Sequence, residues 1–203
     1  MADMSLDPWV VANSRNISPE RLHAIGVITL RWNECEFWLF HLFCGVSGLS
    51  QKDAWTLVHD LGDVAICIRI KTFADQRGYH TDGLDLISNA LQAYDITRQN
   101  RNTISHAWMR NNFALEDTLA RKSKKPDSFD AMPFESDLTT LRQVADEMSR
   151  LEMNLWLLCC VIEDATINGP LTSPRKLALP VALWMPPPPV RTKQMRPPQP
   201  SRA

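Results

Sequence analysis

Apolar residues recur at helical spacing through most of the chain, and this pattern predicts helices rather than strands. The segments with apolar positions three and four apart are 18–48, 50–62, 63–78, 81–108 and 136–167. The first segment is apolar nearly all round, which predicts a central, buried helix. Residues suited to cap these helices are Ser18, Ser50, Asp63 and Ser136. The sequence therefore predicts an all-α fold, an antiparallel bundle of about five helices.

The periodicity fails between residues 109 and 135, where lysines and prolines interrupt the apolar positions. We expect a loop insertion there, with a small hairpin around 113–119. Residues 1–17 lack periodicity and are expected to form an N-terminal arm, so residues 18–167 make up the helical domain. Prolines dominate residues 168–203, which predicts a disordered, proline-rich basic tail.

Charge and cysteine content narrow the setting in which we expect the protein to work. No acidic residue follows Asp164, whereas six of the 22 Lys and Arg do, so 16 bases face 23 acids in residues 1–164. An acidic body argues against a protein that coats nucleic acid. The five cysteines lie mostly among apolar residues and no secretory leader opens the chain, which favours a cytoplasmic protein with reduced thiols. The longest apolar run, 37–49, is too short to cross a membrane.

A short polar segment late in the fourth predicted helix carries the clearest chemistry: Arg101, Asn102 and His106. A guanidinium stays charged and presents a planar fork of donors that fits phosphate oxygens. An imidazole has an unperturbed pKa of about 6.5, so it can give or take a proton near neutrality. These groups can bind a phosphodiester and move its proton without a metal. The chain shows no metal-ligand spacing and no phosphate-binding loop, so we expect no metal and no cofactor.

Helical geometry leaves open which arginine serves the histidine. At about 100° per residue, Asn102 and His106 lie about 40° apart, whereas Arg101 lies about 140° from His106. Arg98, Asn102 and His106 form a cleaner stripe with a spacing of four. A symmetric dimer would remove the difficulty, since Arg101 of one protomer can act beside His106 of the other.

Glu34 on the first predicted helix is a candidate to hold one of these arginines. As a functional residue, it would pair with Arg101 or Arg98 and fix its rotamer. The simpler alternative is that Glu34 faces water or pairs locally with Arg31 three residues earlier.

The segment Arg101-Asn102-x-x-x-His106 resembles the R-x4-6-H motif of HEPN domains, in which a polar residue commonly follows the arginine. The resemblance is specific over six residues and architectural over residues 18–167. It implies an all-helical domain that dimerises. Many members of the family cleave RNA without a metal, often as toxins or in defence against phage. Carried over, Arg101 holds the phosphate, Asn102 orients the site, and His106 acts as acid or base. The implied partners are an RNA substrate, a second copy and an inhibitor protein.

Two alternatives stand beside the ribonuclease. Other members of that family have lost catalysis, so the chain can instead be an inactive helical dimer that binds a protein or a nucleotide, which its acidic body favours. A small DNA-binding regulator is a weaker possibility, because none of the predicted helices is conspicuously basic. Trp108 stands where many toxin members paired with a nucleotidyltransferase carry a modified tyrosine, so we expect no regulation by that route.

Overall fold

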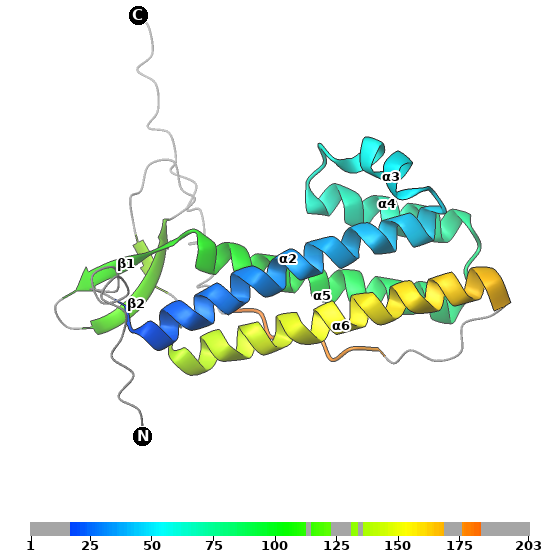
Figure 1. Cartoon of the computed structure of the whole chain (residues 1–203). Coiled ribbons are helices and arrows are strands. Elements are labelled where there is room, and N and C mark those ends of the chain that lie inside the picture. The colour runs from blue at the N-terminus through cyan, green and yellow to red at the C-terminus, as the bar shows by residue number, and fades with distance from the viewer. Residues whose placement is uncertain (1–16, 113–114, 123–130, 134–135, 169–175, 184–203) are drawn as a thin grey trace, which may run out of the picture.

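The computed structural model describes residues 17–112, 115–122, 131–133, 136–168 and 176–183 (Figure 1). Within them the chain forms an all-α bundle of five helices with a small sheet at one end. The helices are α2 (Pro19–Ser47), α3 (Gln51–Val58), α4 (Asp63–Gln76), α5 (Thr81–Ser105) and α6 (Leu138–Asn168). The strands are β1 (Ala107–Asn112), β2 (Leu115–Lys122) and β3 (Ala131–Pro133). No helix of this described part combines the length and apolarity that a bilayer crossing requires.

Consecutive helices alternate in direction, as expected for an antiparallel bundle, but α2 and α6 run parallel (Figure 1). Near their starts, Nη2 of Arg21 donates to the carbonyl oxygen of Ser136 at 2.9 Å. Further along, Sγ of Cys35 donates to the carbonyl oxygen of Met148 at 3.5 Å. The pair is parallel because an even number of reversals separates the two helices along the chain.

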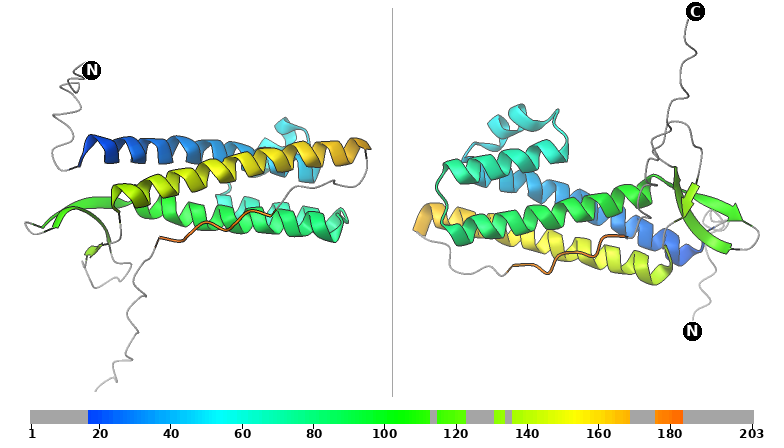
Figure 2. Two further views of the ribbon diagram at one scale, coloured as in Figure 1. Left: turned by 90° about the horizontal axis from the view of Figure 1, so that it is seen from below. Right: turned by 180° about the vertical axis from the view of Figure 1, so that it is seen from behind.

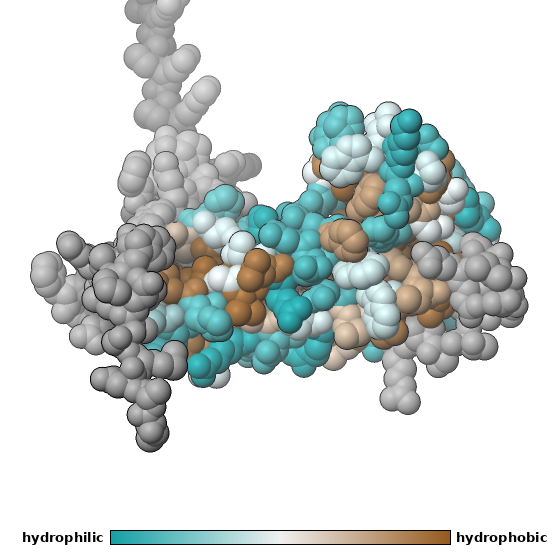
Figure 3. All heavy atoms as spheres, viewed as in Figure 1, coloured by the Kyte–Doolittle hydropathy of each residue, from teal (hydrophilic) through white to brown (hydrophobic). Residues whose placement is uncertain are grey.

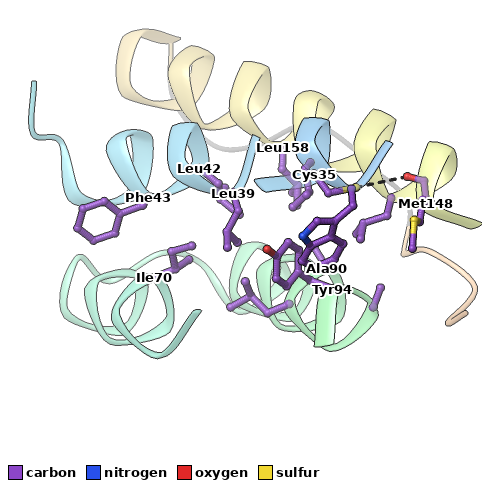
Figure 4. Packing of buried hydrophobic residues seen from close by; sticks show 14 of the residues in the cluster. Cys35, Leu39, Leu42, Phe43, Ile70, Ala90, Tyr94, Met148 and Leu158 are labelled. Carbon is purple, nitrogen blue, oxygen red and sulfur yellow. Dashed lines mark hydrogen bonds between the residues drawn. The ribbon is translucent and has the colours of Figure 1, made fainter. Parts of the chain in front are cut away.

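The core lies between α2, α4, α5 and α6, and Figure 4 shows side chains from each of them meeting there. At its centre the rings of Trp32 and Tyr94 lie 4.9 Å apart, and neither residue is exposed to solvent. The prediction that α2 is buried all round was wrong, because Leu30 is 67% exposed and Phe37 is 49% exposed. The bundle packs against only one side of α2.

Two of the four predicted N-caps are confirmed. The Ser18 hydroxyl accepts from the backbone N–H of Arg21 at the start of α2. The Ser50 hydroxyl accepts from the backbone N–H of Asp53 at the start of α3. Each bond satisfies one of the donors that the first turn of a helix leaves free.

The other two N-caps were wrong by one residue. Gly62 caps α4, and Asp63 lies in its first turn, where a carboxylate favours the positive end of the helix dipole. At α6, Oδ1 of Asp137 accepts from the backbone N–H of Thr140 at 2.8 Å, which is the N-cap geometry expected of Ser136. At α6 the Ser136 hydroxyl accepts instead from the backbone N–H of Leu119, so Asp137 takes the capping position.

The fourth predicted helix ends at Ser105 rather than at Trp108, because the chain enters a sheet. Strands β1 and β2 pair antiparallel with Ala107 opposite Arg121, and β3 adds to β2. The expected hairpin is therefore longer than residues 113–119, and residues 113–114 lie outside the described residues. Ser136 anchors the sheet to the bundle, since its hydroxyl accepts from the backbone N–H of Leu119.

Residues 176–183, which we call the strap, are extended and lie beside α5 on the side opposite α2 (Figure 2). The prediction of a disordered tail from residue 168 was therefore wrong for these eight residues, since polar side chains of α5 and α6 hold their main chain. The rest of that tail beyond residue 183, and the predicted arm before residue 17, lie outside the described residues.

Candidate functional site

Arg101 lies in the last turns of α5, against the side of α2. Its Cζ is 5.2 Å from the centroid of the Trp32 ring, so the guanidinium lies over an aromatic face. Nη1 donates to Oδ1 of Asn102 at 2.9 Å, and Nη2 lies 3.9 Å from Oε1 of Glu36. The Arg101 side chain is 31% exposed. An indole face, an amide and a distant carboxylate therefore hold the guanidinium while leaving part of it open to solvent.

The acid beside Arg101 is Glu36, not the predicted Glu34. Trp32 faces the core, and Glu36 is four residues further along α2, about 40° round the helix from it. Glu34 is about 200° from Trp32 and is exposed on the opposite side of α2. The alternative pairing of Glu34 with Arg31 is also wrong, because Nη1 of Arg31 bonds Oε2 of Glu152 on α6 at 2.8 Å.

The carboxyl of Glu36 has a pKa above its ordinary value. Burial is the main cause, and the negative charge of Asp63 at the start of α4 adds to it. The indole N–H of Trp32 and the guanidinium of Arg101 act in the opposite direction and lower the pKa. A carboxylate that is costly to ionise competes weakly with a phosphate for the guanidinium.

Three polar atoms in the core near Arg101 are buried without a hydrogen-bond partner among the described residues: Nε1 of Trp32, the hydroxyl of Tyr94 and Oγ1 of Thr97. The Trp32 N–H is near enough to Glu36 to lower its pKa, but it does not reach hydrogen-bond geometry. Burial raises the pKa of the Tyr94 hydroxyl well above its ordinary range. None of these groups carries a charge near neutral pH, so none of them offsets the charge of Arg101.

Arg98, the second candidate arginine, is already neutralised. Its Nε and Nη2 both donate to Oδ1 of Asp95, one turn earlier on α5, and the Nε distance is 3.2 Å. The Arg98 side chain is 24% exposed, less than that of Arg101. Of the two arginines, Arg101 is the one with donors available to an incoming anion.

His106 is the residue at which α5 ends. Its φ of −101° and ψ of 9° lie outside the helical region, and its backbone N–H donates to the carbonyl oxygen of Asn102 at 3.2 Å. The residue is exposed, and β1 begins at the next position. Within one copy, Arg101 meets Asn102 through side chains, whereas the contact described between His106 and Asn102 runs through the main chain.

Trp32 and Glu36 are the site residues that sequence reasoning missed. Both lie on α2, almost 70 residues before the motif, and their spacing of four puts them on one face. The signal was a tryptophan inside an apolar stripe with an acid one turn later. It could be recognised only after knowing which side of α2 faces α5.

Among the described residues, no three His, Cys, Asp or Glu side chains gather closely enough to hold a metal ion. No family model, curated protein or solved structure matches the chain. The positions and contacts of Arg101, Asn102 and His106 are therefore the basis for a proposal about function.

Proposed function

We propose that the protein is a metal-independent endoribonuclease in which Arg101, Asn102 and His106 form the active site of a homodimer. Arg101 binds the phosphate of the scissile bond and Asn102 orients the guanidinium. His106 takes the proton of the ribose 2′-OH or gives a proton to the leaving 5′-oxygen. A toxin or a phage-defence effector is the kind of protein in which this activity is expected.

The observation that carries this proposal is the difference between the two arginines. Asp95 occupies two donors of Arg98, whereas Arg101 is held by an indole face and a neutral amide, and its carboxylate partner Glu36 lies no closer than 3.9 Å. A guanidinium that is fixed in orientation and only loosely paired with a carboxylate is suited to a phosphodiester, because little reorganisation is needed when the anion arrives. His106 at the exposed end of the same helix supplies a group that can transfer protons.

The reaction follows from these groups. The 2′-oxygen attacks phosphorus as its proton passes to an imidazole, the P–O5′ bond breaks, and the 5′-oxygen takes up a proton. The products are a 2′,3′-cyclic phosphate and a 5′-hydroxyl. Helical geometry turns Arg101 away from His106 of its own copy, so we expect the second copy to supply the complementary residue.

Cleavage of a labelled RNA by the full chain in EDTA tests the proposal. We expect cyclic phosphate ends in the wild type and a loss of at least 100-fold in His106→Ala, as for removal of a general acid or base. The matched control is His59→Ala, an exposed histidine at the end of α3, which should retain full activity. Activity that persists in the His106→Ala dimer would refute the assignment.

A non-catalytic helical dimer is the second candidate, and the exposed apolar surface of α2 and α6 favours it. The sides of these helices that face away from α5 form an outer face with large side chains 41–67% exposed: Leu30, Phe37, Met153, Trp156 and Leu157. Figure 3 faces α2 and α6 and shows apolar surface among hydrophilic residues there. Exposed apolar area of this kind is typical of protein contacts.

This second candidate predicts self-association through the outer face without RNA cleavage. Phe37→Glu should convert a dimer into a monomer in sedimentation velocity. The control is Ile68→Glu on α4, which is 61% exposed but lies on another helix, and should leave the mass unchanged. Equal masses for both variants and the wild type would remove the outer face as the dimer contact.

A further inference from the structure

Side chains of α5 and α6 make five hydrogen bonds to the main chain of the strap. Asn89 of α5 bonds both backbone groups of Leu177: Oδ1 accepts from its N–H at 2.8 Å and Nδ2 donates to its carbonyl oxygen at 3.2 Å. Asn100 bonds two residues further along the strap, with Nδ2 donating to the carbonyl oxygen of Val181 and Oδ1 accepting from the N–H of Leu183. Oε1 of Glu147 on α6 accepts from the N–H of Val181 at 3.2 Å.

The spacing of the two asparagines matches an extended chain. Asn89 and Asn100 are eleven residues apart, which is close to three helical turns and a rise of about 16.5 Å. An extended chain covers that length in about five residues. Asn100 bonds Val181 and Leu183, and the position between them, Ala182, is five residues after Leu177. The N–H groups used, at 177, 181 and 183, all lie at odd positions and so point to one edge of the strap. Pro180 stands at a position where no N–H is needed.

Of the polar side chains that hold the strap, Asn100 and Glu147 are buried and Asn89 is partly buried. Asn100 is 3% exposed and Glu147 is 7% exposed. Buried amides and carboxylates are costly unless hydrogen-bonded. The strap's main chain supplies two bonds to Asn100 and one to Glu147, whose Oε1 also accepts from Nε2 of Gln143. We call Asn89, Asn100 and Glu147 the strap site, since they fit a peptide backbone rather than a particular side chain.

Side chains add a limited selectivity. Leu177 and Leu183 are partly buried and pack against the core, whereas Val181 between them is 63% exposed. Lys176 pairs with Asp85 at 2.9 Å, and both side chains are more than half exposed. The strap site therefore accepts an extended apolar segment with two leucines six residues apart.

We propose that the strap site is a peptide-binding site and that residues 176–183 are its built-in, exchangeable ligand. The strap is not helical. Its covalent connection to the bundle runs through residues 169–175, which follow α6 in the sequence. Backbone recognition cannot distinguish a strap in cis from a peptide of the same kind in trans, so an extended leucine-containing segment of a partner protein can take its place. The attached strap competes at the high effective concentration of a short connection. This inference is independent of RNA cleavage.

The test uses the full chain with a specific protease site inserted between Asn168 and Lys176. After cleavage, a fluorescein-labelled peptide of residues 176–183 is added and its anisotropy is measured. We expect saturable binding to the cleaved protein and binding at least tenfold weaker to the uncleaved protein, whose site is occupied. Asn100→Ala in the cleaved protein should weaken binding at least tenfold.

Two altered peptides separate main-chain recognition from simple apolar adhesion. Val181→Pro removes the N–H that donates to Glu147, so this peptide should bind at least tenfold more weakly. Val181→Ala changes only an exposed side chain and should bind as the native peptide does. Equal binding of the two altered peptides would overturn the proposal. So would the absence of saturable binding, or a loss of helical circular dichroism when the cleaved strap is exchanged, because the strap would then be an inseparable part of the fold.

Discussion

The guanidinium of Arg101 lies over the ring of Trp32, with 5.2 Å between Cζ and the ring centroid. Trp32 is fully buried, so the platform beneath Arg101 is part of the core itself. A planar guanidinium stacks on an aromatic face in a way that an ammonium group does not. The identity of the residue at position 101 should therefore matter beyond its charge.

Replacing Arg101 by lysine tests this point. The variant keeps the charge but loses the fork, the bond to Asn102 and the stacking on Trp32. We expect RNA cleavage to fall by about 10- to 100-fold, or about 1.4–2.8 kcal/mol of transition-state stabilisation. Arg98→Lys is the control and should change the rate less than about threefold, because Asp95 already occupies that side chain. Equal losses in the two variants would contradict our choice of Arg101.

Glu36 should make stability depend on pH. Burial raises its pKa above that of the unfolded chain, so its contribution favours the folded state at low pH and is lost as the pH rises through the raised pKa. In Glu36→Gln this loss disappears. We expect equal melting temperatures near pH 4 and a slightly higher one for the variant near pH 7. The difference should be small, since the Glu36 side chain is 39% exposed and solvent screens its charge.

The control for that measurement is Glu34→Gln, two residues away on the exposed side of α2, which should melt at the wild-type temperature at both pH values. A Glu36→Gln variant that is less stable than the wild type near pH 7 would mean that attraction to Arg101 outweighs the cost of burial.

The cysteines should differ sharply in reactivity. Burial is the main factor that raises the pKa of both Cys35 and Cys67 to about 12, and nearby acidic side chains add to it. Cys44 and Cys159 are also buried, whereas Cys160 is exposed. Since the thiolate is the reactive form, a disulfide reagent near pH 8 should modify one thiol of the folded protein quickly. Cys160→Ser should remove that fast phase, and a fast phase that survives would show that a buried thiol is accessible.

Gly48 ends α2 and should resist substitution. Its φ is 67°, in the left-handed region, and a Cβ there would lie 2.0 Å from Nη2 of Arg77. We expect Gly48→Ala to lower the free energy of unfolding by about 1–2 kcal/mol. Gly26→Ala is the matched control, because Gly26 is an exposed helical residue with nothing within 4 Å of a built Cβ. It should raise that free energy by about 0.5–1 kcal/mol in urea unfolding.

Local signals in the sequence were enough for the helices and for the starts of two of them. Ser18 and Ser50 cap their helices through their own neighbours, so four residues of sequence contain each interaction. The end of α5 is different, because Ala107 leaves the helical pattern only to pair with Arg121 across the sheet. A partner 14 residues away leaves no trace in the helical periodicity.

The strap shows the same limit over a longer separation. Asn89 and Asn100 look like ordinary polar positions of an amphipathic helix, and their bonds reach residues more than 80 positions further along the chain. A proline-containing segment without periodicity is typical of solvated chain. Its ordered position here depends on polar side chains of α5 and α6, which the segment's own sequence does not reveal. Glu36 could not be chosen over Glu34 from the sequence, because the choice depends on which side of α2 faces α5.

The parallel pairing of α2 with α6 affects how the protein is made. Their bond between Arg21 and Ser136 spans 115 positions, so α2 leaves the ribosome long before its main packing partner exists. At about 5–20 residues per second, synthesis leaves several seconds in which Arg101 and His106 have emerged on a helix without a finished core. A ribonuclease of the kind proposed here would therefore lack its folded active site until α6 has left the ribosome.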